Sequence, residues 1–433
     1  MSGVPLTERL ERAAGSDPAA VALTCADRSV TYGELWRGVQ AVAAFLGAQG
    51  LRKGERVAVL SENSAEYVIA YYGALLSGAI AVGLNAAAKP RDIVRWLEHC
   101  DAAWLFADGA YPGLEEIRRS ERSRVRVVPL QNVHAGDGEA VLPEILNVYA
   151  GAAPGAPRLG EGDTAALVYT SGTTGSPKGV TLSHGNLAAN VDAILRYLRL
   201  TPAESVSVVL PFYYAYGASL LHTHLAVGAR LVLERSLMYP HRILQRIAAE
   251  RVTGFAGVPS TYALLLTRTS FEDYDLGSLR YVTQAGGPMG PQWIARLREA
   301  LPATALYVMY GQTEATARLT YLPPEDLDRK PGSVGVPVDG VRIEIRDPRG
   351  ERLPPFSAGE ICARGPNVMQ AYWGNRELTE QVLVDGWLRT GDLGHVDAEG
   401  YVYVQGRASD MIKTGAHRVS PQETEEVIAE LSG

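Results

Sequence analysis

The stretch YTSGTTGSPKGVTLSHGN, from Tyr169 to Asn186, decides the fold assignment. ALVYT, which leads into it, and GVTLS within it have the apolar, β-branched composition of strands. Ser183 precedes apolar residues at helical spacing, so it is predicted to cap a helix. The sequence therefore predicts a strand, a loop, a second strand and a helix in this order.

The loop between these strands has the chemistry of a polyphosphate-binding nest. Its glycines, which permit unusual backbone angles and the close approach of a ligand, are Gly172, Gly175 and Gly179. Lys178 adds a mobile positive charge, and hydroxyl donors come from Thr170, Ser171, Thr173, Thr174 and Ser176. The Walker pattern does not fit, because it requires glycine directly before the lysine and Pro177 stands there. A flexible turn rich in serine and glycine is the simpler alternative.

Length and charge limit the class of protein. A single hydrophobic core stops growing at about 250–300 residues, so the 433 residues of this chain predict two or three subdomains. The net charge of −7 argues against a nucleic-acid binder, which needs a basic stripe. Cys25, Cys100 and Cys362 form no metal-binding spacing, so buried free thiols in a reducing cytosol are expected. No apolar signal segment follows Met1, which also favours a cytoplasmic protein.

The uncharged segment from Tyr67 to Ala88 is long enough to cross a membrane, but its glycines and Asn85 interrupt it. We interpret it as a buried helix, a turn at Ser77-Gly78 and a short buried strand, so no membrane span is expected.

Alternating helices and strands predict a doubly wound α/β structure for most of the chain. Arg56–Ser61 has the composition of a buried parallel strand, and Gly151–Asp163 that of a connector. A second α/β region is expected to contain strands near Ala166–Tyr169, Ser207–Pro211, Arg230–Glu234, Gly254–Val258 and Tyr281–Gln284. From about Pro331, apolar and polar residues alternate between glycine and proline turns, which predicts antiparallel β structure.

The loop YTSGTTGSPKGV resembles the phosphate loop of the adenylate-forming superfamily, which includes acyl-CoA synthetases, nonribosomal adenylation domains and luciferases. Four further motifs have the order and spacing of that family: VTYGELWRGV (Val30–Val39), YGQTEAT (Tyr310–Thr316), LRTGDLG (Leu388–Gly394) and GRASDMIKTGAHRVSP (Gly406–Pro421). The resemblance implies two doubly wound α/β subdomains and a distorted antiparallel β-barrel. It also implies a large AMP-binding domain over residues 1–408, with its β subdomain from about 331, followed at 409–433 by a hinge and the start of a C-terminal domain.

The resemblance further implies an ATP- and Mg²⁺-dependent ligase. Such an enzyme lets a carboxylate attack the α-phosphate of ATP, and the thiol of CoA or of a carrier-protein phosphopantetheine then takes the acyl group. Fixed donors and Mg²⁺ would stabilise the charge that grows on phosphate oxygens. Catalytic roles would fall to Lys178, Thr313 and Glu314. The nucleotide would contact Thr170, Ser171, Gly172, Thr173, Thr174, Gly175, Lys178, Gly286, Gly287, Pro288, Tyr310, Gly311, Gln312, Thr313, Asp392 and Arg407.

Individual roles follow from the same resemblance. Tyr310 would lie against the adenine, Thr313 would bond the α-phosphate and Glu314 would ligate Mg²⁺. Asp392 would accept both ribose hydroxyls, which suits a bidentate carboxylate, and Arg407 would reach the ribose. The alternatives are a surface charge for Glu314, a turn residue for Asp392 and a solvated surface arginine for Arg407.

The acid-binding residues are expected in LPFYYAYGASLLHTHL, from Leu210 to Leu225. Relatives that activate amino acids place an aspartate where this chain has Tyr214, and a tyrosine offers no full negative charge at neutral pH. An α-amino acid is therefore disfavoured, whereas a fatty, branched or aryl acid fits an aromatic and largely apolar pocket. Its wall would comprise Tyr213, Tyr214, Tyr216, Gly217, Leu221 and Gly311. These aromatic residues are equally compatible with an ordinary core, and the pair His222 and His224 lacks a third metal ligand.

The family pattern normally continues with a small C-terminal domain that carries a lysine serving adenylation, and no such segment is found before Gly433. A fragment of a longer enzyme is the favoured explanation, and a naturally short homologue is the alternative. Either case predicts intact nucleotide binding and weak adenylation by this chain alone.

The sequence thus predicts an acid–thiol ligase of the acyl-CoA or acyl-carrier-protein type, acting on a small carboxylic acid. One rival is a stand-alone adenylation protein that loads a carrier protein in natural-product biosynthesis. Another is a catalytically silent ligand-binding homologue, which the presence of Lys178, Glu314 and Asp392 argues against.

Overall fold

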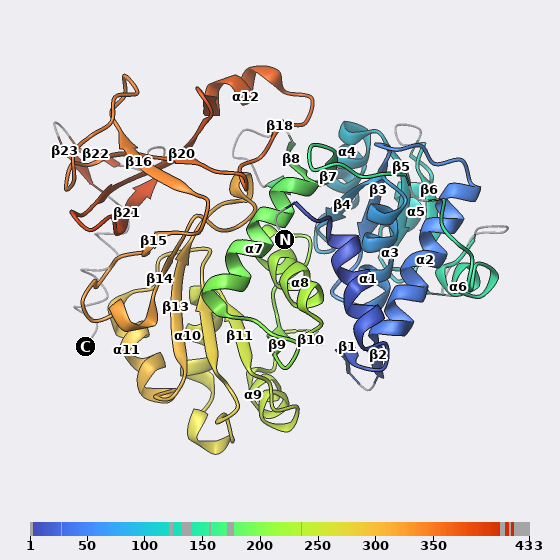
Figure 1. Ribbon diagram of the computed structural model, residues 1–433, viewed down its shortest axis with the longest axis horizontal. Coiled ribbons are helices and arrows are strands. Elements are labelled where there is room, and N and C mark those ends of the chain that lie inside the picture. Colours follow the sequence, from blue (N-terminus) through green and yellow to red (C-terminus); the bar gives the residue numbers. More distant parts are fainter. Residues whose placement is uncertain are drawn as a thin grey trace. The chain divides into compact units, whose positions relative to one another are not determined.

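The computed structural model describes residues 3–26, 28–120, 124–131, 140–155, 157–170, 177–234, 236–407, 412–414 and 417–419. These residues form two compact units (Figure 1). Unit 1 comprises Met1–Ser236 and Met369–Arg376, and unit 2 comprises Leu237–Val368 and Glu377–Gly433. The predicted domain boundary after residue 408 lies outside the described residues, so it remains a prediction.

Unit 1 contains a mostly parallel sheet in the order β18-β8-β7-β4-β3-β5-β6. Its strands are β3 (Arg56–Leu60), β4 (Ile80–Leu84), β5 (Ala102–Ala107), β6 (Arg126–Pro129), β7 (Thr164–Thr170), β8 (Lys178–Ser183) and β18 (Ala371–Tyr372). All neighbours from β7 to β6 are parallel, whereas β8 is antiparallel to both β7 and β18. The carboxyl ends of β3, β4 and β7 therefore lie at one edge of this sheet.

The rest of unit 1 consists of strands of a second sheet and of eight described helices. A four-stranded portion of that second sheet has the order β9-β10-β1-β2, and its strands are β1 (Val21–Cys25), β2 (Arg28–Thr31), β9 (Ser205–Val208) and β10 (Arg230–Leu233). The helices are α1 (Leu6–Ser16), α2 (Tyr32–Ala48), α3 (Ala65–Leu76), α4 (Pro90–Cys100), α5 (Leu114–Arg118), α6 (Leu142–Val148), α7 (His184–Leu198) and α8 (Ala215–Val227).

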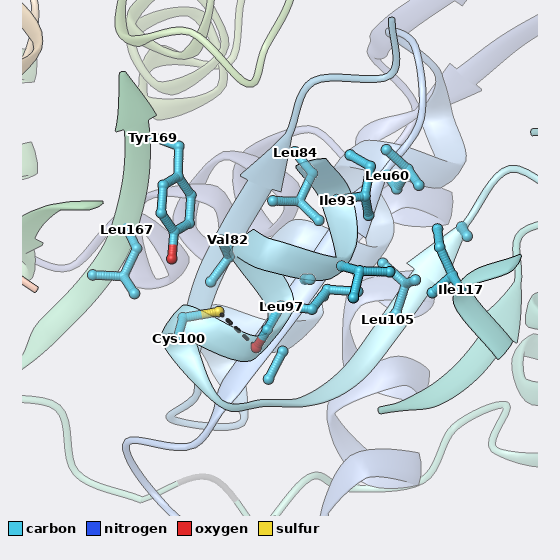
Figure 2. Packing of buried hydrophobic residues seen from close by; sticks show 14 of the residues in the cluster. Leu60, Val82, Leu84, Ile93, Leu97, Cys100, Leu105, Ile117, Leu167 and Tyr169 are labelled. Carbon is cyan, nitrogen blue, oxygen red and sulfur yellow. Dashed lines mark hydrogen bonds between the residues drawn. The ribbon is translucent and has the colours of Figure 1, made fainter. Parts of the chain in front are cut away.

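The core of unit 1 explains why its strands are continuous apolar runs. Figure 2 shows Val82 and Leu84 of β4 packed with Leu97 of α4 and with Leu167 and Tyr169 of β7. Parallel strands covered by helices are buried on both faces, so they show no polar alternation.

Unit 2 contains a sheet portion in the order β15-β14-β13-β12-β11, in which β11, β12 and β13 are parallel. Its strands are β11 (Gly254–Gly257), β12 (Tyr281–Gln284), β13 (Ala305–Tyr310), β14 (Thr320–Leu322) and β15 (Val336–Pro337), and its helices are α9 (Pro240–Ala249), α10 (Pro259–Arg268) and α11 (Pro291–Ala300). Helix α12 (Arg376–Val382) begins at the last residue of the second segment of unit 1.

The predicted antiparallel region is also present in unit 2. Its strands are β16 (Arg342–Arg346), β17 (Gly359–Arg364), β19 (Leu383–Val384), β20 (Trp387–Val396) and β21 (Val402–Arg407). They are joined in antiparallel pairs, and a small core of Ile345, Ile361 and Val402 lies among them. A separate hairpin consists of β22 (Ile412–Thr414) and β23 (His417–Val419).

Most predicted elements are confirmed, and two details are corrected. The Ser183 side chain caps α7 by accepting from the backbone of Asn186, as predicted. The strand predicted at Ser207–Pro211 ends at Val208, because the chain turns at Pro211, where the N–H of Tyr214 donates to the Pro211 carbonyl. Cys100 and Cys362 are buried free thiols, whereas Cys25 is only partly buried.

Within the described ranges, no helix is both long and apolar enough to cross a membrane. The segment from Tyr67 to Ala88 instead contains α3, a turn with Gly78 at φ +81° and β4.

Candidate functional site

The predicted phosphate loop begins at the carboxyl end of β7 in unit 1. Thr170 and Lys178 are register partners in the antiparallel pair β7–β8, so the two ends of the loop are fixed opposite each other. Lys178 is partly buried. The predicted contacts Ser171, Gly172, Thr173, Thr174 and Gly175 lie outside the described residues. The structure therefore defines the base of the loop and the position of its lysine.

The base of this loop is anchored to α4 through Tyr169. The Tyr169 hydroxyl lies 2.9 Å from Nδ1 of His99 and 3.2 Å from the Trp96 carbonyl, to which it donates. Its ring stacks on Trp96 with centroids 5.6 Å apart. On the paired strand, Gly179 is the register partner of Tyr169, and a Cβ there would lie 3.3 Å from Cβ of Trp373. Tyr169, which precedes the proposed phosphate contacts, is thus held by α4 and lies opposite Gly179 on the paired strand.

The predicted acid-binding residues occupy the turn between β9 and α8. The rings of Tyr213 and Tyr214 meet edge to face with centroids 4.7 Å apart, and Tyr214 is 47% exposed. Burial, followed by the neighbouring Tyr214 and Glu62, raises the pKa of Tyr213 to about 12, so it is neutral at physiological pH. Tyr216 is the second residue of α8 and is partly buried. Tyr213 and Tyr214 together form the aromatic surface of this turn.

Two other predicted pocket residues are enclosed by unit 1 itself. A Cβ on Gly217 would lie 2.0 Å from the Pro211 carbonyl oxygen, so glycine is needed for the turn to close. Leu221 is 1% exposed, which fits the alternative that it belongs to the core.

Asn85, which sequence reasoning did not select, contacts this aromatic surface. It follows β4, and its Nδ2 lies 3.3 Å from the hydroxyl of Tyr214 while its Oδ1 accepts from the backbone of Ala87. The available signal was its place directly after a parallel strand, where ligand-binding side chains gather.

In unit 2, the loops that follow β12 and β13 carry the predicted adenine and phosphate contacts. Gly286 has φ +84°, a conformation that side-chain-bearing residues avoid. The side chain of Gln284 donates to the carbonyl of Gly287 at 2.7 Å and fixes the loop. Gly286, Gly287 and Pro288 are exposed. Their backbone is therefore accessible to a flat ligand.

The structure brings Tyr310, Asp392 and Arg407 together, although the first is distant in sequence from the other two. Asp392 is 6% exposed. Its Oδ2 accepts from the Tyr310 hydroxyl at 2.6 Å, and Nε of Arg407 lies 3.2 Å from its Oδ1. Because an ionised carboxylate has about four acceptor positions, capacity remains for two ligand hydroxyls.

The environment of Asp392 perturbs its acidity. Burial raises its pKa above the ordinary value, while the hydrogen bond from Tyr310 and the charge of Arg407 oppose the rise. The carboxylate of Glu314 is close enough to raise the pKa of Asp392 further. The predicted ribose and magnesium carboxylates therefore lie in one electrostatic environment.

The YGQTEAT turn that carries Thr313 and Glu314 is tightly constrained. Thr316 and Ala317 both have left-handed backbone angles, with φ +52° and +87°, and such residues persist only where the surroundings hold them. A buried amide from another loop does so, because Nδ2 of Asn367 donates to the carbonyls of Ala315 at 3.0 Å and Arg318 at 2.7 Å. The turn is thus preorganised.

The turn also retains capacity for a ligand. Nε2 of Gln312 is buried and has no hydrogen-bond partner among the described residues. An unsatisfied buried donor is costly, and a ligand acceptor would satisfy it.

The charged groups fit a magnesium–nucleotide complex better than a protein-only metal site. In the part of the chain that the structure describes, no group of three or more His, Cys, Asp or Glu side chains could hold a metal ion. Mg²⁺ is usually bound by one or two carboxylates together with phosphate oxygens and water. Glu314 offers one such carboxylate.

Comparisons with known proteins identify the family. A sequence profile of the family described as AMP-binding enzyme matches residues 10–373. The feruloyl-CoA synthase of Amycolatopsis sp is 33% identical over 414 residues, covering 96% of this chain and 81% of that relative.

Two solved structures with bound intermediates share the fold. The o-succinylbenzoate CoA synthetase from Bacillus subtilis, in complex with its acyl-adenylate intermediate, has a TM-score of 0.87 at 29% identity and covers 99% of this chain and 84% of that one. The same enzyme has been solved with ATP and a magnesium ion. The anthranilate CoA ligase AuaEII in complex with anthranoyl-AMP has a TM-score of 0.89 at 28% identity, covering 99% and 83%. The predicted superfamily and fold class are confirmed.

Proposed function

The chain belongs to the AMP-binding enzyme family, and on this premise we propose that it ligates an aromatic carboxylic acid to CoA in two steps. First, the carboxylate attacks the α-phosphate of ATP, pyrophosphate leaves and an acyl-adenylate forms. Second, the thiolate of CoA attacks the acyl carbon, and AMP leaves with the electrons of the broken bond. The ATP-dependent acid–thiol ligase activity is supported by relatives that are CoA ligases.

The observation that carries the proposal is the buried Asp392 carboxylate held by Tyr310 and Arg407. A carboxylate at 6% exposure is costly to bury unless its acceptor positions are hydrogen-bonded or paired with charge. Two hydroxyls of a ribose would complete its acceptor positions. The ring of Tyr310 is held by its own hydroxyl, so its face can pack on adenine.

Catalytic roles follow from the groups near this carboxylate and at the phosphate loop. Lys178 would neutralise charge on the phosphates, and Thr313 would donate to the α-phosphate. Glu314 would hold Mg²⁺, which stabilises charge on phosphate oxygens when it is bound. Because the 3-10 turn of Thr313–Ala315 is fixed in advance, Thr313 and Glu314 need little reorganisation during the reaction.

The choice of an aromatic acid rests on the edge-to-face pair Tyr213 and Tyr214. An aryl ring gains both burial and favourable ring geometry on such a surface. The described residues of the turn carry no charge to pair with an α-ammonium group, so an α-amino acid is disfavoured. A fatty or branched acid would gain only burial.

A carrier-protein phosphopantetheine is the second candidate for the thiol acceptor, because it presents the same thiol as CoA. A thioester assay that offers CoA and a loaded carrier protein in parallel separates the two. Since both ATP and CoA are cytoplasmic metabolites, we place the protein in the cytoplasm.

Thermal shift with non-hydrolysable acyl-sulfamoyl-adenosines tests the proposal by binding alone. The panel would carry benzoyl, cinnamoyl, octanoyl, palmitoyl and aminoacyl groups. A ligand at about 100 times its dissociation constant adds roughly 2.7 kcal/mol of stability. We expect the aryl compounds to give the largest shifts, and a preference for palmitoyl would reassign the substrate class.

The matched control is Asp392→Asn, which preserves the shape of the side chain and removes its charge. We expect it to weaken every adenosine compound alike, because ribose recognition is shared. If the unchanged chain binds no compound of the panel, the proposed activity is wrong.

A further inference from the structure

We propose that Asn63 is a positioning residue for acid recognition, because its side-chain amide sets the course of the backbone that presents Tyr213 and Tyr214. This inference rests on the proposed function of that turn. It adds a residue from outside the turn, in the loop between β3 and α3.

Asn63 pairs with the backbone of the turn in the way a neighbouring strand would. Its Nδ2 donates to the carbonyl of Leu210 at 2.9 Å, and its Oδ1 accepts from the N–H of Phe212 at 2.9 Å. These two backbone groups lie two residues apart and face the same side, as they do along a strand edge. β9 has already ended at Val208, so the amide continues the pairing where the sheet no longer does.

The loop that carries Asn63 is itself fixed. Ser64 caps α3 by accepting from the backbone of Tyr67 at 3.0 Å. Asn63 therefore stands directly before a helix whose first turn is anchored. A side chain mounted there can hold a turn rigidly, because its own backbone has little freedom.

Hydrophobic packing holds the backbone of the turn in the same position as the hydrogen bonds of Asn63. Phe212 is 2% exposed, and its ring lies 5.7 Å from the ring of Tyr67 in α3. A Cβ on Gly83 of β4 would lie 2.7 Å from the Tyr67 hydroxyl and 3.1 Å from Cα of Tyr213. The backbone of Tyr213 is therefore packed closely against the sheet, immediately after the residue that Asn63 binds.

Three successive residues of the turn differ in burial and in contacts. Phe212 is buried and hydrogen-bonded, Tyr213 is partly buried, and Tyr214 is exposed, with its hydroxyl 3.3 Å from Nδ2 of Asn85. Because Phe212 and Tyr213 are the central residues of the turn that the Tyr214 N–H closes onto the Pro211 carbonyl, a shift of the backbone at Phe212 would move both tyrosines. Asn63 prevents this shift without itself belonging to the aromatic surface.

The test compares the affinities of benzoyl-sulfamoyl-adenosine and AMP, measured by titration calorimetry. Asn63→Ala removes both hydrogen bonds. We expect it to weaken the benzoyl compound about tenfold while the affinity for AMP stays within about twofold. Asn147→Ala, at an exposed asparagine of α6, is the matched control and should change neither affinity.

Asn63→Asp separates positioning from a general loss of structure. At pH 8 the carboxylate can accept from Phe212 but cannot donate to Leu210, so affinity for the benzoyl compound should fall as in the alanine variant. An aspartate with an ordinary pKa near 3.9 is about half protonated at pH 4, which restores the donor in that fraction, so the ratio of variant to wild-type affinity should rise between pH 8 and pH 4. A variant that merely unfolds locally would show no such recovery.

Three outcomes would overturn the inference: unchanged affinity for the benzoyl compound in both variants, equal loss of the benzoyl compound and AMP, or no recovery of Asn63→Asp between pH 8 and pH 4. These differ from failure of the proposed function, in which the unchanged chain itself binds no benzoyl compound. If Asn63→Ala does not fold, the pH dependence of Asn63→Asp decides alone.

Discussion

The replacement Tyr310→Phe removes the hydroxyl that binds the buried carboxylate of Asp392 and changes little else. That hydroxyl donates to Oδ2 of Asp392 at 2.6 Å, and it is the strongest of the influences that lower the pKa of Asp392. The phenylalanine ring fills the same space, so the proposed packing against adenine is preserved. The variant therefore isolates what the hydroxyl does for the carboxylate.

The size of the effect follows from the burial of Asp392, which is 6% exposed. A hydrogen bond to a charged group is worth about 1.5–3 kcal/mol, and little water is available to replace it. We expect the free energy of unfolding to fall by roughly 2 kcal/mol at pH 7.5. For a folding unit of 150–250 residues this lowers the Tm by about 4–8 °C.

The pH dependence of the stability loss distinguishes a lost hydrogen bond to Asp392 from an ordinary loss of packing. Burial raises the pKa of Asp392 in the folded chain, and Tyr310→Phe raises it further. A carboxyl group with a raised folded pKa destabilises the protein above that pKa and has no effect below the unfolded value near 3.9. The deficit of the variant should thus be largest at neutral pH and shrink toward pH 4.

The assay is thermal unfolding of wild type and variant at pH 4.5 and 7.5, with Tyr239→Phe as the control at an exposed tyrosine. The difference in Tm between variant and wild type at each pH is compared, because this difference cancels the titration of groups that both proteins share. A deficit that is the same at both pH values, or that grows on acidification, would refute the electrostatic reasoning. A Tm within about 1 °C of wild type at pH 7.5 would refute the hydrogen bond itself.

Three further predictions concern unit 1. Tyr169→Phe loses the hydrogen bonds to α4 at the base of the predicted phosphate loop. Measured by calorimetry, the affinity for ATP should fall severalfold and that for AMP should fall less. Equal losses for ATP and AMP would contradict a role of Tyr169 in shaping the phosphate loop. Burial lowers the pKa of His222 to about 3, so below about pH 6.5 the unfolded chain binds a proton that the folded chain does not, and stability falls. His222→Phe should therefore reduce the fall in Tm between pH 6.5 and 4.5. Tm profiles of variant and wild type that run parallel over this range would contradict the prediction. Gly217→Ala places Cβ 2.0 Å from the Pro211 carbonyl and should cost at least about 2 kcal/mol in urea unfolding, whereas Gly47→Ala, with open space around it, should be neutral or stabilising.

Local signals were sufficient for the elements that carry the motifs. Tyr281–Gln284 was predicted at its observed bounds, and the capped helix after Ser183 was predicted from its capping residue. Both follow from patterns within a few residues, such as an apolar run bounded by glycine or a hydroxyl before an amphipathic segment. Tyr310 and Asp392 were selected by resemblance, and the contact between them came from the structure.

The residues that fix the loops could not be predicted in this way. Asn63 and Asn85 stand in short loops after strands, where asparagine is expected as an ordinary turn residue. Their partners, Leu210, Phe212 and Tyr214, are far away in the sequence. Only the pairing of β3 and β4 in one sheet shows that both amides reach the same turn. A pattern of a few residues holds no information on such contacts.

Each unit uses a side-chain amide to fix the loop that carries its proposed ligand contacts. Asn63 binds the backbone of the acid-side turn in unit 1, and Asn367 binds the carbonyls of Ala315 and Arg318 beside the Thr313–Glu314 turn in unit 2. An amide is suited to this task because it combines donors with an acceptor and carries no charge to perturb the phosphates. A carboxylate would face carbonyl oxygens with negative charge, and an aliphatic side chain would leave those carbonyls unsatisfied. The two asparagines are therefore not interchangeable with their usual replacements, although neither is proposed to touch a substrate.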